Sequence, residues 1–166
     1  MSMRTNKAAF CRFLDQALNN GNLAVLEEIL HPDFTGYFPG PAEAVHGAAG
    51  CRRWVGDLRS GFGDINALIE GGWLIAETGT HEVGKGVQTE RVAALVVLRG
   101  TQSGTFAGVP ATGRRVVWTQ AHMLRFADGL IIEDVVVGDT LGQLRQMGVT
   151  DLGATSATSP VLPELI

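Results

Sequence analysis

The chain has 166 residues, 45% of them hydrophobic, and a formal net charge of −4. This length and apolar content suit one domain with a sizeable core. The 13 basic residues are spread along the chain without a basic stripe, which argues against nucleic acid as a partner.

Targeting and cofactor signals are absent from the sequence. No apolar run is long enough to span a bilayer and the first residues lack the layout of a signal peptide, so we expect a cytoplasmic protein without a membrane partner. Cys11 and Cys51 fall on the apolar sides of expected helices, which predicts buried, reduced thiols. No Cys/His spacing fits a metal site and no P-loop or GxGxxG motif follows a strand, so the sequence predicts neither a metal nor a cofactor.

The first 60 residues predict three helices and one short strand. Apolar residues recur at helical spacing, with Thr5 and Asn22 as expected N-caps of the first two helices. The expected helices cover residues 6–20, 22–30 and 48–60. The strand covers residues 34–38, and a loop rich in Gly and Pro follows it.

Beyond residue 60 the chain turns to β-structure. Apolar runs predict strands over residues 64–69, 73–77 and 92–98. The last of these runs is nearly continuous, which predicts burial of both faces. Gly71 and Gly72 separate the first two strands and predict a bulge or bend. Loops are expected over residues 78–90 and 100–113.

Residues 114–139 predict two strands joined by a tight turn at Ala127-Asp128-Gly129. If Phe126 pairs with Leu130, counting outward puts His122 directly opposite Asp134. One face of the hairpin then carries Trp118, Gln120, His122, Leu124, Ile132, Asp134 and Val136. An imidazole and a carboxylate thus meet among apolar neighbours, and this pair is the candidate functional site.

The expected fold class is α+β, with N-terminal helices packed on a strongly curved antiparallel sheet. A last helix over residues 140–147, with Asp139 as its cap, ends a single domain over residues 1–149. Residues 150–166 are expected to be a flexible tail. The curved sheet would enclose a pocket, and the aromatic residues expected along it are Tyr37, Trp54, Trp73 and Trp118.

Several stretches resemble the SnoaL-like polyketide cyclases, which have the nuclear-transport-factor-like cone fold. The similar stretches span residues 6–149 and are His31-Pro32-Asp33-Phe34, Phe62-Gly63-Asp64, residues 104–114, residues 120–126 with Asp128-Gly129, and Asp139 with residues 144–148. The resemblance implies a cone-shaped cavity and dimerisation through the sheet. It leaves the reaction open, because one fold hosts many chemistries.

The resemblance also bears on the hairpin. In the cyclases of this family, a Gln-x-His pair lines the cavity beside a catalytic aspartate on the last strand. Gln120 and His122 match that pair, whereas Val136 stands at the position of the aspartate. Either the acid is displaced by one step to Asp134, or the cyclase chemistry is lost. Gln102 is a second departure, since many relatives have His there.

Each candidate residue has a structural alternative. His122 with Asp134 is an acid–base dyad or a cross-strand pair that only stabilises the sheet. Gln120 stabilises an enolate oxygen or satisfies a buried backbone group. The residues expected to shape the substrate site, or else to form plain core, are Trp118, Tyr37, Trp54 and Val136.

Our hypothesis is a cofactor-independent polyketide-tailoring enzyme that uses acid–base catalysis for an aldol-type cyclisation. Its partners would be a hydrophobic, carbonyl-rich small molecule and a second copy of the chain. Two alternatives remain: a ring hydroxylase of the same family, and a non-catalytic small-molecule-binding protein. A binder should tolerate His122→Gln, whereas an enzyme should lose turnover.

Overall fold

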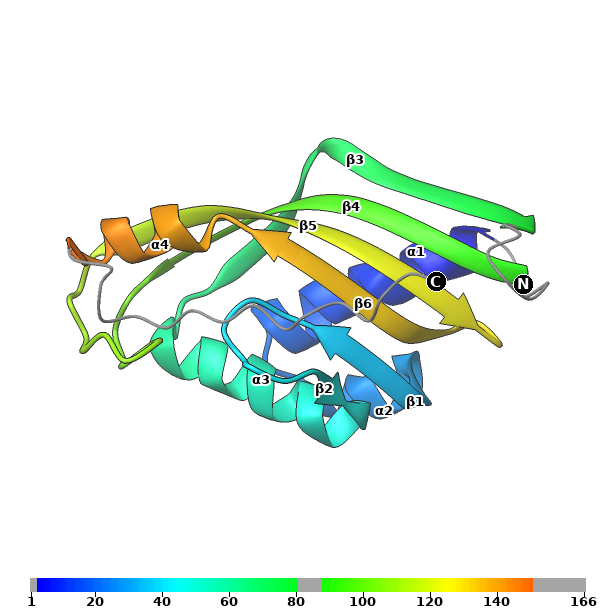
Figure 1. Cartoon of the computed structure of the whole chain (residues 1–166), viewed down its shortest axis with the longest axis horizontal. Helices are drawn as coiled ribbons and strands as arrows, with labels where there is room; N and C mark the ends of the chain where they lie inside the picture. Colours follow the sequence, from blue (N-terminus) through cyan, green and yellow to red (C-terminus); the bar gives the residue numbers. More distant parts are fainter. Residues whose placement is uncertain (1–2, 81–87, 151–166) are drawn as a thin grey trace.

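In the computed structural model, which describes residues 3–80 and 88–150, the helices lie under a curved sheet (Figure 1). The helical elements are α1 (Met3–Arg12), its π-helical continuation η1 (Phe13–Asn19), the 3₁₀ turn η2 (Leu23–Val25), α2 (Leu26–Ile29), α3 (Gly47–Gly61) and α4 (Thr140–Gln146). The strands are β1 (Leu30–Tyr37), β2 (Val45–His46), β3 (Asn66–Thr80), β4 (Gln88–Thr101), β5 (Arg115–Ala127) and β6 (Leu130–Gly138).

The six strands form one sheet in the order β2-β1-β6-β5-β4-β3. All neighbours are antiparallel except β1 and β6, which are parallel. This architecture confirms the predicted α+β class with N-terminal helices packed on a curved sheet. The parallel pair is a difference from the expected antiparallel sheet, and it brings the first strand beside the last one.

The N-terminal helices bury one apolar stripe against the sheet. Its residues are Phe10, Phe13, Leu14, Ala17 and Leu18, all buried. The helix begins at Met3, so the expected cap Thr5 lies inside it, and Asn22 makes no side-chain cap bond. Cys11 is exposed, which corrects its predicted burial, whereas Cys51 is buried as predicted. No helix among the described residues is long and apolar enough to cross a membrane.

The bend in β3 follows from two adjacent glycines. Gly71 and Gly72 have φ angles of 53° and 75°, which residues with a Cβ rarely adopt. The pairing of β3 with β4 shifts register at this point. The predicted bulge is confirmed, and the two expected strand pieces form one bent strand (Figure 1). Asn19 fixes this edge strand to the helices, because its side chain bonds both the N–H and the C=O of Ala67 at 2.7 and 3.0 Å.

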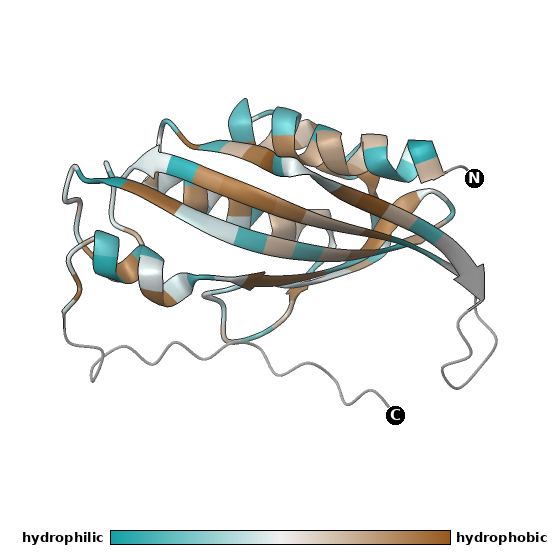
Figure 2. Cartoon of the chain, turned by 90° about the horizontal axis from the view of Figure 1, so that it is seen from above, coloured by the Kyte–Doolittle hydropathy of each residue, from teal (hydrophilic) through white to brown (hydrophobic). Residues whose placement is uncertain are grey.

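The sheet has a buried inner face toward the helices and an apolar outer face. In β4, buried residues alternate with less buried ones from Val92 to Leu98, so the predicted burial of both faces is wrong. Trp73 is 60% exposed, contrary to its expected place along an enclosed pocket. The large exposed apolar residues of the sheet are Leu68, Trp73, Ile75, Val117, Met123 and Val137. Brown apolar segments run along the middle of the long strands in Figure 2.

The loop between β4 and β5 is held by Gln102, which is fully buried. Its amide NH₂ donates to the carbonyls of Val109 and Pro110, each at 3.0 Å, and its carbonyl accepts from the Thr112 hydroxyl at 2.5 Å. The buried amide therefore has its own polar groups paired, and it ties residues 109, 110 and 112 of the loop together. At the position where the resemblance leads one to expect His, Gln102 is a structural anchor of the loop.

Candidate active site

The turn of the β5–β6 hairpin has two residues, not three. Ala127 pairs with Leu130, and the turn residues Asp128 and Gly129 have φ angles of 52° and 79°. Positive φ at both central positions is the signature of a type I′ turn, whose twist matches that of paired strands. The predicted pairing of Phe126 with Leu130 is therefore wrong by one residue.

A bulge three residues further along changes the register again. Phe126 pairs with Ile131 but Arg125 pairs with Glu133, so Ile132 is an extra residue in β6. The turn and the bulge each shift the pairing of β6 against β5 by one residue from the predicted register. The total shift is two residues, and because side chains alternate between faces, every side chain beyond the bulge stays on its predicted face. The predicted shared face of His122 and Asp134 is thus correct, although their direct opposition is wrong.

In the actual register, His122 lies opposite Val136, and Asp134 lies opposite Leu124. Beyond the bulge the inward residues of β6 are therefore those predicted. Next to the turn, Ile131 is buried and Ile132 is only half-buried, which reverses the prediction for these two positions. On the outer face, Arg125 and Glu133 are direct neighbours and make two hydrogen bonds of 2.5 and 2.9 Å.

His122 and Asp134 contact each other diagonally across the hairpin. The imidazole Nδ1 lies 2.9 Å from the Oδ2 of the carboxylate, and the two residues are 1% and 3% exposed. A carboxylate accepts hydrogen bonds, so Nδ1 carries the proton and donates it. In the neutral imidazole Nε2 then bears the lone pair, which is the state that a general base requires.

Three buried polar atoms of this inner face have no hydrogen-bond partner within the described residues. They are Gln120 Oε1, His122 Nε2 and Asp134 Oδ1. Buried polar atoms are nearly always paired in folded proteins, so a cluster of unpaired ones marks a place for polar groups of a ligand or water. Gly138 lies directly opposite Gln120 and leaves the amide free of a facing side chain.

The surroundings of the pair are aromatic and apolar. The Phe10 ring of α1 lies 5.1 Å from the His122 ring, centroid to centroid. Gly36 of β1 is the strand neighbour of Asp134, and a Cβ there would lie 2.5 Å from the Phe38 ring. Burial, and then the negative charge of Asp134, raise the pKa of the Cys51 thiol to about 12, so Cys51 stays neutral beside the carboxylate.

The other predicted site residues divide into two groups. Trp118 and Val136 are buried on the inner face, with the Trp118 ring 5.0 Å from Phe62. Trp54 of α3 is partly buried and stacks on Phe38 at 4.0 Å. Tyr37 is a correction: it pairs with Val135, whose side chain lies on the outer face, because the parallel β1–β6 register puts Gly36 beside Asp134.

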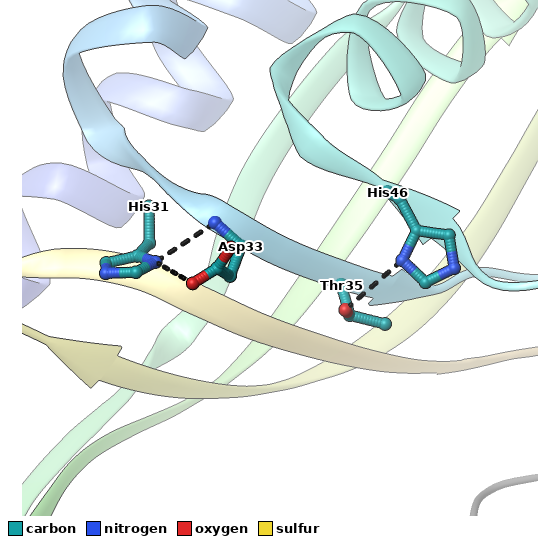
Figure 3. Close-up of polar contacts among 4 residues, drawn as sticks. All are labelled: His31, Asp33, Thr35 and His46. Carbon is teal, nitrogen blue, oxygen red and sulfur yellow. Dashed lines mark hydrogen bonds and ion pairs between the residues drawn. The ribbon is translucent and has the colours of Figure 1, made fainter.

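Two further histidines, His31 and His46, lie on β1 and β2. His31 Nδ1 accepts a hydrogen bond from the backbone N–H of Asp33 at 3.1 Å and lies 3.8 Å from the carboxylate of Asp33. His46 Nδ1 lies 3.4 Å from the Thr35 hydroxyl (Figure 3). The Asp33 side chain is 86% exposed, whereas that of Asp134 is 4% exposed. Of these two His–Asp pairs in the described part of the chain, the His122–Asp134 pair is the one sealed from solvent. His81 lies outside the described residues.

Asp139 has the capping role predicted for it. Its Oδ1 accepts from the Gly142 N–H at 2.8 Å at the start of α4. No group of three or more His, Cys, Asp or Glu side chains in residues 3–80 and 88–150 is arranged to hold a metal ion. The groups that the β5–β6 hairpin contributes to the inner face are the imidazole of His122, the carboxylate of Asp134 and the amide of Gln120.

The chain is similar to several known proteins. A family model described as SnoaL-like polyketide cyclase matches residues 8–147. The nogalonic acid methyl ester cyclase of Streptomyces nogalater is 31% identical over 136 residues, 80% of this chain and 90% of the relative. The aklanonic acid methyl ester cyclase DauD of Streptomyces sp. (strain C5) is 38% identical over 72 residues, 43% of this chain and 45% of the relative.

Among solved structures, TsrD from Streptomyces laurentii has a TM-score of 0.73 and 26% identity, covering 89% of this chain and 98% of TsrD. The fold is an α+β cone, and the inner face of its sheet carries the buried polar residues Gln120, His122 and Asp134. With the family model matching most of its length, the chain belongs to the SnoaL-like polyketide cyclase family.

The sequence did not indicate two residues beside the pair, Phe10 as a cover for His122 and Cys51 as a neighbour of Asp134, nor the buried amide of Asn6 on the same helix as Phe10. Asn6 and Phe10 are four residues apart on α1 and both are buried. Their helical spacing signals that they share a face. Which strand that face meets depends on contacts between distant parts of the chain.

The carboxylate of Asp134 should fix the tautomer of His122. In Asp134→Asn, an amide replaces the carboxylate and can present either its acceptor oxygen or its donor NH₂ to the ring. We therefore expect imidazole protonated on Nε2 to appear beside the form protonated on Nδ1. Nitrogen NMR of labelled His122 measures the two forms. Asp33→Asn, which alters the exposed His–Asp pair, is the control and should leave His122 signals unchanged. An unaltered tautomer in Asp134→Asn would contradict the assigned hydrogen bond.

Proposed function

We propose that this protein catalyses an aldol-type ring closure on a hydrophobic, carbonyl-rich polyketide substrate, without a cofactor. The observation that carries the proposal is the buried, unpartnered Nε2 of His122, whose ring is oriented by Asp134. The names of the two curated relatives, both methyl ester cyclases, support the substrate class.

In the proposed reaction His122 acts first as base and then as acid. Nε2 takes a proton from a carbon between two carbonyls of the substrate, and the C–H electron pair becomes an enolate. The enolate carbon bonds to a second carbonyl carbon, whose π electrons move to oxygen as an alkoxide. The imidazolium returns the proton to that alkoxide, so the reaction is a net isomerisation.

Asp134 and Gln120 have separate roles in this proposal. The carboxylate holds the ring orientation and stabilises the imidazolium by charge at 2.9 Å. The amide NH₂ of Gln120 donates to the enolate oxygen, two residues from His122 on the same face. Trp118, Trp54 and Val136 shape the apolar surroundings that keep water from the enolate. Tyr37, on the outer face, has no part in it.

Ring hydroxylation is the second candidate, favoured by Val136. This residue lies directly opposite His122, where the resemblance leads one to expect the catalytic acid. The same carbanion would then bond to dioxygen, and the proton held by His122 would complete a hydroperoxide on carbon. A two-electron reductant such as a thiol would then have to cleave the O–O bond, which leaves the hydroxyl on the ring and releases water. Isotope-labelled dioxygen distinguishes the two reactions, because ring closure incorporates none of the label.

His122→Gln should lower kcat for nogalonic acid methyl ester or aklanonic acid methyl ester by about 10²- to 10⁴-fold, because the base is lost. Affinity should change far less, since glutamine keeps a polar side chain of similar reach. Product formation by chromatography and ligand binding by calorimetry measure the two quantities.

His46→Gln is the matched control and should leave kcat unchanged, since that ring lies on β2, exposed and bonded to Thr35. If His122→Gln binds and turns over like the wild type, both enzymatic proposals fail. Binding retained in a wild type that turns nothing over would favour the small-molecule-binding protein.

We also propose that the outer face of the sheet is the contact between two copies of the chain. Exposed apolar residues lie on three long strands of that face: Leu68, Ile75, Val117, Met123 and Val137. Contiguous apolar surface of this kind is rare on proteins that stay monomeric.

Replacing Val117 by Asp should shift the sedimentation of the protein from dimer to monomer, because a charge would be buried at the contact. Asp57→Arg, on the exposed side of α3, is the control and should leave the dimer intact. A wild type that sediments as a monomer would contradict the proposal.

A further inference from the structure

Asn6 on α1 is a buried amide outside the site described above. It is 1% exposed, and its Nδ2 donates to Glu90 Oε2 at 2.5 Å. A carboxylate only accepts hydrogen bonds, so this contact fixes which end of the amide points to Glu90. The other end, Oδ1, has no hydrogen-bond partner in the described part of the chain. Asn6 is thus an oriented, buried acceptor that the fold leaves unused.

Asn6 faces the same interior as His122. Phe10, one helical turn further along α1 and on the same side, lies 5.1 Å from the His122 ring. Glu90 belongs to the inner face of β4, because it pairs with the buried Phe126 of β5. Figure 1 shows the start of α1 near the place where β3 ends and β4 begins.

Asn6 and His122 are the polar ends of a stretch of the inner face, and the strand residues between them are apolar. Glu90 pairs with Phe126, Val92 with Leu124, and Ala94 with His122. Four residues of strand separate Glu90 from Ala94, roughly 13 Å. Val92 and Leu124 are 1% and 2% exposed and form the apolar stretch. This separation matches the length of a few fused rings.

We propose that Asn6, oriented by Glu90, is a second polar subsite that accepts a hydrogen bond from a hydroxyl at the far end of an aromatic ligand. The inference rests on the proposed function, in which the interior holds such a ligand with its reacting carbons at His122. Asn6 makes the site selective for ligands that end in a donor, since a ligand without one leaves Oδ1 buried and unpaired.

The test compares two unreactive probes, 2-hydroxyanthraquinone and anthraquinone, which differ by one hydroxyl. Titration of the wild-type protein, followed by quenching of tryptophan fluorescence, should show the hydroxylated probe binding about 3- to 10-fold more tightly. Asn6→Leu, a change of similar size, should abolish that preference and leave the affinity for anthraquinone unchanged.

Gln16→Leu makes the same kind of change on η1, where the side chain is half-buried, and should keep the preference. A second measurement needs no variant: the side-chain carbonyl resonance of Asn6 in the wild type should shift with the hydroxylated probe and stay unchanged with anthraquinone. Equal affinities of the wild type for the probes, failure of the hydroxylated probe to bind, or a preference retained in Asn6→Leu overturns the proposal. Since neither probe reacts, these outcomes are independent of whether His122 is a base.

Discussion

The hydrogen bond from His122 Nδ1 to Asp134 is the interaction on which the account of this protein depends. It lies on the inner face of the sheet, 2.9 Å long and sealed from solvent, with Phe10 over the ring. By holding the proton on Nδ1, the carboxylate leaves Nε2 as a buried lone pair without a partner among the described residues. A sheet-stabilising pair would not need that free nitrogen or the free oxygens of Asp134 and Gln120 around it.

The pair exists because two irregularities of the β5–β6 hairpin compensate each other. A two-residue turn alone would move every inward side chain of β6 to the outer face. The extra residue at Ile132 reverses that shift, and Asp134 returns to the inner face one step away from the position opposite His122. Val136 takes that opposite position, so an apolar side chain stands where the family resemblance places an acid. A diagonal contact replaces the direct one, and the hydrogen bond is kept.

Local patterns in the sequence predicted much of this fold, and contacts between distant segments account for what they missed. The alternation of β5 and the Gly71-Gly72 bulge are encoded by neighbouring residues, and both were predicted correctly. Ile131 and Ile132 are equally apolar, so the sequence does not distinguish which one faces inward. Tyr37 was assigned to the wrong face because its orientation depends on the parallel β1–β6 register. Asn6 and Glu90 are 84 positions apart, and no local pattern links them.

The central claim is that His122 Nε2 removes a proton from carbon. The most direct measurement is the incorporation of solvent deuterium into a 1,3-dicarbonyl analogue of nogalonic acid methyl ester that lacks the carbonyl to be attacked, so that proton removal occurs without ring closure. If His122 is the base, the wild type should exchange this proton well above the rate in buffer, and His122→Gln should exchange it at the buffer rate. Equal exchange by the wild type and His122→Gln would show that another group removes the proton.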